Sequence, residues 1–578
     1  MTTRRIVAIC LLLAGGVALL ALERRLVTAE ITPRPLLYLV ADTEREVERI
    51  PLALTRLSER EENQIGQELA RGYGLMPAIH KETDAQRISA YVQEVGKRLT
   101  ANVKRKEIQY RFFYKDEPGF VNAGALPGGQ IVIGRGLLEL LESEDELAAI
   151  LGHEVAHVDE RHAIERLQYE VQSKKIGMRG LYRLAQIGVV LYQMGYTKEK
   201  EDEADRLGLG LTVAAGYSPA GAVEVMKRFD RLFGGQAHTA TSPVEEMTGM
   251  PLKSLKEYFR SHPPARERIA TLEKEIQARG YNAAQAQKPL GVRAIFLAEQ
   301  AEGLDKRGMF DRAIARYREA LKLEPGNKWA WSGLAYAAWR AGDARTTVEA
   351  ATEALKLDAE WEQMWKRLAR ALAVENVRAA STRYSELLAR FAPKEMAKQS
   401  LAQVESAGLE LTTGNKAAVT TYQEILNRGL TVETQVMARR QMAWWMYRSG
   451  RLKEAEGELE AARQRDPRDG WVNHQLAWVQ SDLGRQADAQ KNLAESRENK
   501  PDDADDALEA VILWRIDAKK EAQAKFQHAA EADPVWMVSK WVANNYSAEA
   551  TAVIAKLQAE EMARRKKEEA RRKVVGSR

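Results

Sequence analysis

Apolar and polar residues alternate along most of this chain at the period of a helix. In 144–158, acidic residues come first and an apolar stripe follows, which is how a buried amphipathic helix begins. Residues 181–194 keep the helical spacing but contain polar interruptions, so we expect an amphipathic helix there and not a second membrane span. Gln130–Ile133 predicts a short strand after a Pro-Gly-Gly turn. The predicted fold is therefore mainly α with a small β-sheet.

The N-terminus has the pattern of an export signal. An uncharged apolar run, Ile6–Leu22, follows two arginines and fits a signal peptide or a short membrane anchor. Small residues in Val27–Ala29 resemble a cleavage site, whereas the charges of Glu23–Arg25 argue against cleavage. We expect an exported protein in which 1–29 is either removed or kept as an anchor to the inner membrane.

The second half of the chain repeats with a fixed period. Gly308 and Gly342 are 34 residues apart, as are Gly450 and Gly484. This is the period of the tetratricopeptide repeat, a pair of antiparallel helices that stacks into a solenoid with a concave face. Clear repeats are expected at 292–358 and 436–501, with weaker units up to 393 and at 414–427, and a partial unit ending near 534.

Composition and charge narrow the possible functions. The chain of 578 residues is too long for one core, and its net charge of +5 includes no basic stripe with interleaved aromatic residues, so nucleic acid is not expected as a partner. The single cysteine, Cys10, lies in the N-terminal apolar run, which excludes a thiol nucleophile and disulfides from the rest. We expect a leader or anchor at 1–29, a catalytic domain at 30–290, the repeat array at 291–545 and a charged tail at 546–578.

Two features of the repeat half have both a structural and a binding interpretation. All 12 tryptophans lie between Trp329 and Trp541; packing between helices explains most of them, and a few are candidates for recognising a partner. The basic residues of 564–573 fit a solvated helix end, or else a segment that binds anionic lipid near a membrane.

The chemistry is concentrated in 151–158, where His153 and His157 are four residues apart. On a helix both imidazoles leave the same face and can hold one Zn²⁺, while Glu154 can act as a general base toward water. A third ligand is expected from the acidic stretch 198–208, where Glu201 and Asp205 share a helical face. One would ligate and the other orient a ligand histidine. Spacing alone does not exclude three competitors: Glu199, Asp202 and Glu203.

These motifs together resemble the M48 metallopeptidase family, whose pattern is His-Glu-x-x-His followed by Glu-x-x-x-Asp. The resemblance implies a zincin-like (gluzincin) α+β domain holding one Zn²⁺ per chain. It also implies zinc ligands His153, His157 and Glu201, with Glu154 as general base and Asp205 orienting a ligand.

Two further segments resemble the family. Asn122–Gly134 resembles its stretch before the metal helix, and an edge strand there would pair with an extended peptide. The residues expected to bind substrate are thus Asn122, Gln130, Ile131 and Val132. Ser261–Ile269 resembles an element in which His262 caps or assists the zinc and Arg268 stabilises the oxyanion. A helix start containing prolines and a surface arginine is the plain structural alternative.

The resemblance implies a zinc metalloendopeptidase of the periplasm or another exported location. Its substrates would be unfolded or misassembled envelope proteins, and the repeat array would bind these clients or the outer-membrane assembly machinery. Two alternatives stay open from the sequence: a repeat scaffold or chaperone with a latent zinc site, and a membrane-anchored processing protease.

Overall fold

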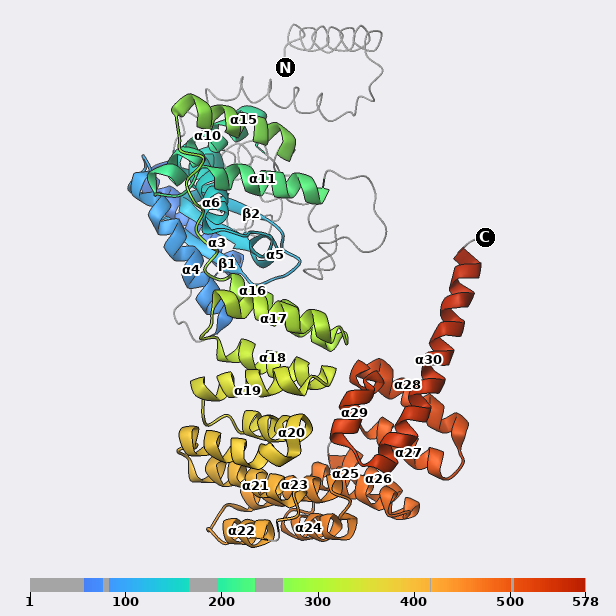
Figure 1. Cartoon of the computed structure of the whole chain (residues 1–578). Coiled ribbons are helices and arrows are strands. Elements are labelled where there is room, and N and C mark those ends of the chain that lie inside the picture. The colour runs from blue at the N-terminus through green and yellow to red at the C-terminus, as the bar shows by residue number, and fades with distance from the viewer. Residues whose placement is uncertain are drawn as a thin grey trace, which may run out of the picture. The chain divides into compact units, whose positions relative to one another are not determined.

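The computed structural model describes residues 57–75, 83–165, 196–233, 264–415, 417–499 and 504–576. The leader, the helix expected at 181–194 and His262 lie outside these residues. The chain divides into two compact units, Met1–Leu290 and Gly291–Arg578 (Figure 1). Among the described helices, none combines the length and apolar character needed to cross a bilayer.

The first unit is built around one fully buried helix, α6 (Glu144–Asp159). Ser143 caps it by accepting a hydrogen bond from the Glu146 amide at 3.0 Å, and acidic residues fill its first turn. The other described helices of this unit are α3 (Glu59–Gly72), α4 (Asp84–Leu99), α5 (Arg135–Glu139), α10 (Lys198–Ala214), α11 (Ala220–Phe233) and α15 (Ala265–Arg279), with short 3₁₀ turns at Thr100–Asn102 and Pro127–Gly129. Helices α4, α10 and α11 pack against α6, so the core surrounds the metal motif.

A three-stranded mixed sheet completes this unit within the described residues, in the order β1–β3–β2. The strands are β1 (Arg111–Lys115), β2 (Ala123–Leu126) and β3 (Gln130–Gly134). The predicted strand exists, but the expectation that it lies at an edge is wrong: β3 pairs in parallel with β1 and antiparallel with β2. Its backbone groups are thus already used on both sides, and Gln130, Ile131 and Val132 are fully buried. These three residues cannot bind a peptide by strand addition.

The second unit is an all-helical solenoid, visible as successive helix pairs in Figure 1. Its helices are α16 (Arg293–Lys306), α17 (Phe310–Leu323), α18 (Lys328–Ala341), α19 (Ala344–Leu357), α20 (Glu362–Phe391), α21 (Met396–Thr412), α22 (Ala417–Leu426), α23 (Val432–Arg448), α24 (Leu452–Arg465), α25 (Gly470–Asp482), α26 (Gln486–Asn499), α27 (Ala504–Arg515) and α28 (Lys519–Ala532). Asn376 has extended backbone angles inside α20, so this element is itself two successive helices.

The repeating glycines and alanines of this unit have distinct structural tasks. Gly308 and Gly342 both have φ of 74°, a left-handed conformation that lets the chain turn from the first helix of a repeat into the second. Ala320 and Ala354, also one period apart, are completely buried where neighbouring helices meet. The 34-residue period therefore has two structural causes, the turn between the helices of a repeat and the close packing of neighbouring helices.

The C-terminal part of the solenoid returns across its concave face. This closing segment, Asp533–Ser547, contains the 3₁₀ turn Pro534–Met537 and helix α29 (Ser539–Asn545). Arg340 of α18 pairs with Asp305 at 2.5 Å and also with Asp533, far along the chain. Tyr546 accepts a hydrogen bond from Arg448 of α23 through its carbonyl oxygen. The segment thus ties early repeats to later ones.

The charged tail expected from residue 546 is part of helix α30 (Ala548–Gly576). Ala550, Ile554 and Leu557 on its first turns are buried in the solenoid core. The boundary drawn before residue 546 therefore separates residues that pack together, because the run of charges further along masked the apolar stripe. Only the later, basic turns of α30 extend away from the core (Figure 1).

Candidate metal centre

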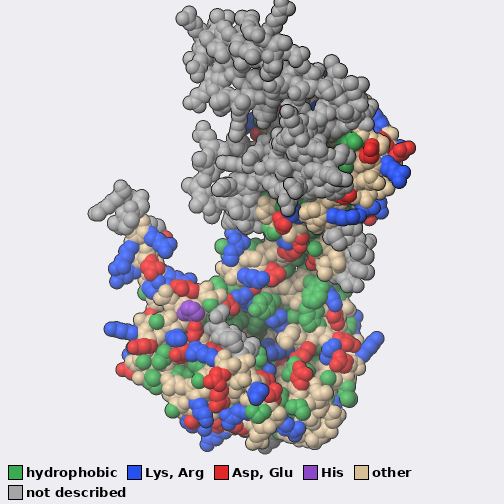
Figure 2. All heavy atoms as spheres, turned by 180° about the vertical axis from the view of Figure 1, so that it is seen from behind, with side chains coloured by type: hydrophobic (Ala, Val, Ile, Leu, Met, Phe, Trp, Pro, Cys, Tyr) green, Lys and Arg blue, Asp and Glu red, His purple; other side chains and the backbone are tan. Residues whose placement is uncertain are grey.

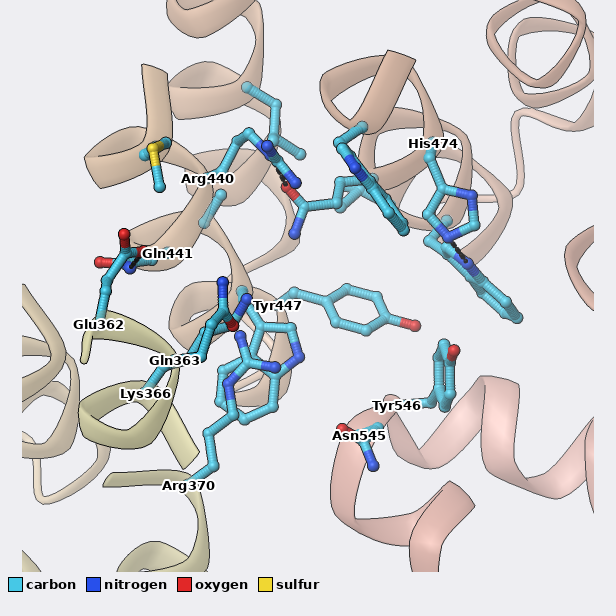
Figure 3. A pocket seen from close by; sticks show the side chains of 18 residues that line it. Glu362, Gln363, Lys366, Arg370, Arg440, Gln441, Tyr447, His474, Asn545 and Tyr546 are labelled. Atoms are coloured by element: carbon cyan, nitrogen blue, oxygen red, sulfur yellow. Dashed lines mark hydrogen bonds between the residues drawn. The ribbon is translucent and has the colours of Figure 1, made fainter. Parts of the chain in front are cut away.

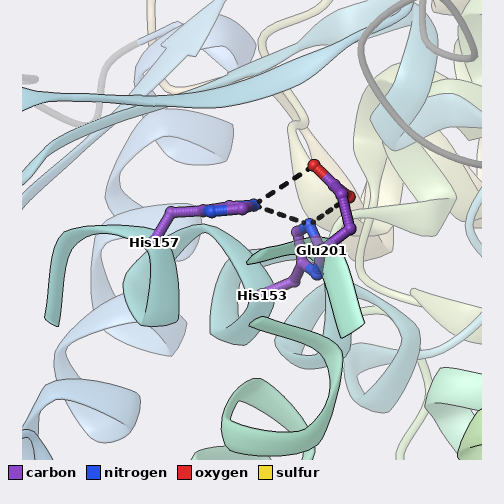
Figure 4. A group of neighbouring side chains, drawn as sticks. All are labelled: His153, His157 and Glu201. Carbon is purple, nitrogen blue, oxygen red and sulfur yellow. Dashed lines mark hydrogen bonds and ion pairs between the residues drawn. The ribbon is translucent and has the colours of Figure 1, made fainter. Parts of the chain in front are cut away.

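Three buried side chains meet between α6 and α10. His153 and His157 leave one face of α6, and Glu201 faces them from the first turn of α10 (Figure 4). The two imidazole Nε2 atoms are 3.1 Å apart. The Glu201 carboxylate oxygens lie 3.5 Å from Nε2 of His153 and 3.6 Å from Nε2 of His157. The three ligands expected from the sequence therefore converge, as do no other three described His, Cys, Asp or Glu residues.

This cluster fits a zinc ion by its distances and its donor atoms. Tetrahedral coordination with metal–ligand bonds of about 2.0–2.1 Å separates neighbouring ligand atoms by roughly 3.3–3.4 Å. The observed separations of 3.1, 3.5 and 3.6 Å bracket that value. Two imidazoles and one carboxylate also leave a fourth position open, as in catalytic zinc sites. The fold thus brings together the ligand atoms that the ion requires.

Asp205 holds His153 in the orientation for ligation. Its Oδ1 lies 2.8 Å from Nδ1 of His153, on the opposite side of the ring from the Nε2 that faces Glu201. A proton on Nδ1 satisfies the carboxylate and leaves the Nε2 lone pair for a metal. The orienting role expected for Asp205 therefore agrees with its position, one helical turn after Glu201 on the same face of α10.

His157 has its own support, which spacing in the sequence did not reveal. Nδ1 of His162 lies 3.0 Å from Nδ1 of His157, and Nε2 of His162 lies 3.4 Å from Glu203. When Nδ1 of His157 carries the proton, it donates to His162, and His162 can direct its own N–H toward Glu203. Nε2 of His157 is then left for the metal. Glu203, a competitor for the third ligand position, instead ends this chain of contacts.

The turn after α6 brings His162 back beneath His157. Arg161 has φ of 66°, a left-handed conformation that costs a non-glycine residue about 1–2 kcal/mol. Its guanidinium compensates by donating to the Leu57 carbonyl at 3.0 Å and lying 3.8 Å from Glu62. In the sequence, the pair Arg161-His162 directly after the metal helix is the signal for this arrangement.

Arg268 lies behind the metal ligands. Its guanidinium donates two hydrogen bonds to Asp205, at 2.9 and 2.6 Å, and sits 3.2 Å from Nδ1 of His153. It is 3% exposed. The expected oxyanion role and the surface alternative are both wrong for this geometry, because the charge is buried on the Nδ1 side of His153 and engaged by a carboxylate. Arg268 positions Asp205.

The electrostatics of this group keep Asp205 ionised. Burial acts to raise its pKa, but the Arg268 charge and the hydrogen bond with His153 outweigh burial, and the pKa of Asp205 is lowered to about 2. For His153, burial and the Arg268 charge act to lower the pKa, whereas the hydrogen bonds with Asp205 and Glu201 prevail and raise it to about 9. Asp205 therefore remains a carboxylate that holds both neighbours at neutral pH.

Two glycines allow α6 and α10 to come close enough for these contacts. A Cβ on Gly208 would lie 2.7 Å from the backbone nitrogen of His153, and one on Gly152 would lie 2.7 Å from Oγ1 of Thr212. A side chain at either position would force the helices apart. The close packing of α6 against α10 brings Glu201 and Asp205 within reach of the two histidines.

The other residues singled out from the sequence differ in their positions relative to the three ligands. Glu154 follows the first ligand on α6 and is 1% exposed, and its role as general base stays a prediction. Glu199 and Asp202 are outside the cluster, and Asn122 is buried with its backbone carbonyl accepting from Gly134 at 2.9 Å. Tyr196, not expected from the sequence, stacks on His157 with ring centroids 3.9 Å apart.

Comparison with known proteins supports both units. Residues 86–276 match the model of peptidase family M48, and residues 400–489 match a tetratrico peptide repeat model. A "Beta-barrel assembly-enhancing protease" of Yersinia pestis is 26% identical over 186 residues, covering 28% of this chain and 36% of the relative. The protein of that name in Escherichia coli (strain K12) is 27% identical over 214 residues, covering 32% and 42%.

A mitochondrial metalloendopeptidase of Schizosaccharomyces pombe is 30% identical over 176 residues, covering 29% of this chain and 50% of the relative. The chain thus spans half or less of the length of these three relatives. A tetratricopeptide repeat protein from Parabacteroides merdae aligns with a TM-score of 0.29 at 19% identity, over 46% of this chain and 98% of that one.

Proposed function

Since residues 86–276 form a peptidase family M48 domain and tetratricopeptide repeats follow it, we propose that the chain is a zinc-dependent metalloendopeptidase. Its substrates are unfolded or misassembled envelope proteins, which the repeat unit binds. The export pattern at the N-terminus and the name of the Yersinia and Escherichia relatives support an exported, periplasmic location and substrates of this class.

The observation that carries this proposal is the buried His153–His157–Glu201 group with Asp205 behind it. Two imidazoles, each oriented by a further side chain, and a carboxylate match the ligand set of catalytic zinc. Glu154 adds a base that a structural metal site does not need. The same group argues against a pure scaffold with a latent site.

The reaction follows from the positions of these residues. When bound, Zn²⁺ supplies Lewis acidity that activates water and polarises the scissile carbonyl. Glu154 accepts the proton of the attacking water and returns it to the leaving amine. Asp205 and His162 hold the two histidine rings in place during both steps, and Arg268 keeps Asp205 charged.

Cleavage of unfolded casein by the full chain tests this function, with Glu154→Gln as the inactive control and zinc content measured for both. We expect cleavage by the wild type only, loss of about 10²–10⁴-fold in the variant, and about one zinc per chain in each. Zinc without cleavage in both proteins would mean a structural site. Absence of zinc in both would refute the metal centre.

Export is tested separately, by fractionating cells that express the chain and sequencing its N-terminus. We expect it in the periplasmic or membrane fraction, beginning either after Ala29 or at the original N-terminus. Recovery of the uncleaved chain in the cytosol would contradict export while leaving the peptidase activity untouched.

A further inference from the structure

The repeat unit contains a cavity of about 430 Å³ on its concave side. Its wall comes mainly from α20, α23 and α25, with Leu459 of α24, and the end of the closing segment covers one side with Asn545 and Tyr546 (Figure 3). In the space-filling view, hydrophobic and basic side chains surround the hollow of this unit (Figure 2). The size lies at the lower end of the range for ligand pockets, about 300–1,000 Å³. It therefore suits a chain end or a small group better than a helix.

Positive charge dominates the wall. Lys366, Arg370 and Arg440 line the cavity, against one lining carboxylate, Glu362. Arg440 lies 3.4 Å from Asp469 and is partly neutralised by it. Lys366 and Arg370 make no hydrogen bond or ion pair with any described residue. Two half-buried cations at one cavity therefore lack an anion in contact.

Burial makes the positive charges of Lys366 and Arg370 costly for the folded protein. Burial lowers the pKa of the Lys366 ammonium, and it lowers the pKa of Arg370 to about 10. Glu405 offsets part of this charge from behind the wall, but its carboxylate accepts a hydrogen bond from Trp445 at 2.8 Å. A protein that keeps poorly paired cations at a cavity loses stability unless a ligand supplies the negative charge.

The remaining lining combines aromatic rings with polar side chains. The rings of Trp444, Tyr447, Trp471, Trp478 and Tyr546 provide apolar surface, and Arg370 is held over Trp444 at 3.6 Å from its centroid. Stacking fixes the guanidinium in place before a ligand arrives. Oε1 of Gln441 is buried without a hydrogen-bond partner among the described residues and can accept from a peptide N–H.

We propose that this cavity binds the free C-terminus of a polypeptide, with the terminal carboxylate between Lys366 and Arg370 and an apolar last side chain against the aromatic rings. A peptide terminus supplies both of the missing partners, a carboxylate for the cations and an N–H for Gln441. An inorganic anion supplies only the first. The site lies wholly within the repeat unit and does not depend on the metal centre or on peptidase activity.

The test measures binding of a fluorescein-labelled peptide, Gly-Ser-Ala-Thr-Val-Leu, to the full chain carrying Glu154→Gln, so that no cleavage interferes. The same peptide as a C-terminal amide, and an amide containing an internal Asp, are the comparisons. We expect the free acid to bind about tenfold or more tightly than either amide, because a charge-assisted contact is lost.

Variants then locate the site. We expect Lys366→Met and Arg370→Gln to weaken binding of the free acid about tenfold each. Lys356→Met, which removes an exposed lysine of α19 paired with Glu353, should leave binding unchanged. Melting curves of every variant verify folding, and Lys366→Met removes a costly buried charge, so it is expected to fold.

Four results would overturn the proposal. These are no binding of any peptide, equal binding of acid and amide, equal binding of the internal-Asp amide, or equal weakening by Lys356→Met and Lys366→Met. Equal binding of the acid and either amide would show that the cavity does not recognise a chain terminus. The fourth would show only a general attraction for negative charge. None of them bears on casein cleavage by the metal centre.

Discussion

Nδ1 of His162 lies 3.0 Å from Nδ1 of His157, so a residue outside the metal motif sets the orientation of a metal ligand. Contacts of this kind are worth about 10–100-fold in metal affinity. We therefore expect His162→Phe to weaken zinc binding by that factor in competition with a chelator, and added zinc to restore casein cleavage. His528→Phe, at an exposed histidine of α28, is the control. Equal zinc affinity in both variants would exclude the orienting role.

Arg268 and Arg266 lie on the same helix but have opposite environments. Arg268 is buried against Asp205, whereas Arg266 is 71% exposed in its pair with Asp230. Arg268→Gln leaves a buried carboxylate poorly compensated, so we expect the free energy of unfolding to fall by about 3–5 kcal/mol. Arg266→Gln should change it by less than about 1 kcal/mol. Urea unfolding of the two proteins measures the difference, and similar losses would mean that Asp205 does not depend on Arg268.

The contact between α6 and α10 predicts a sharp difference between two glycines. We expect Gly208→Ala to reduce zinc content and casein cleavage strongly, because its Cβ would meet the His153 backbone at 2.7 Å. At Gly210 the nearest atom is the Tyr281 hydroxyl at 3.9 Å, so Gly210→Ala should keep zinc and gain about 0.5–1 kcal/mol of stability from helix propensity. Full zinc content in Gly208→Ala would show that the helices can separate without losing the site.

Lys366 predicts a pH-dependent stability. Its pKa is lowered from 10.5 by burial, with Arg370 and Arg440 acting in the same direction and Glu405 and Glu362 opposing it. Between the lowered value and 10.5 the unfolded chain binds more protons, so the wild type gains stability as pH rises through that window. Lys366→Met should therefore melt about 2–4 °C higher than wild type at neutral pH.

This advantage should shrink as the pH approaches 10.5, where Lys366 is also neutral in the unfolded chain. Calorimetry across the range measures the effect, with Lys356→Met as the control that should show no such trend. A variant that melts lower than wild type at neutral pH would mean that the Lys366 charge is well compensated in the free protein.

Local sequence was sufficient to predict a contact wherever a regular structural period places residues of known spacing side by side. His153 and His157 share a face because a helix repeats every 3.6 residues, and the same rule places Asp205 beside Glu201. The repeat unit could likewise be predicted, since the glycine turns and buried alanines recur at one interval. In each case the contacts are formed by residues close in sequence, so the pattern carries the information.

Contacts between distant segments were decided by packing. Nothing in the pattern of Gln130–Gly134 reveals that this strand lies between two others, because strand order depends on how the whole unit closes. The local sequence around Arg268 is that of a charged surface helix. In the structure α15 packs beside α10, and this packing buries Arg268 against Asp205. At the cavity, Lys366 and Arg370 are neighbours on α20, but the packing of the solenoid brings Arg440 of α23 and Tyr546 of the closing segment to the same wall. Such pairings depend on three-dimensional closure, which local periodicity does not encode.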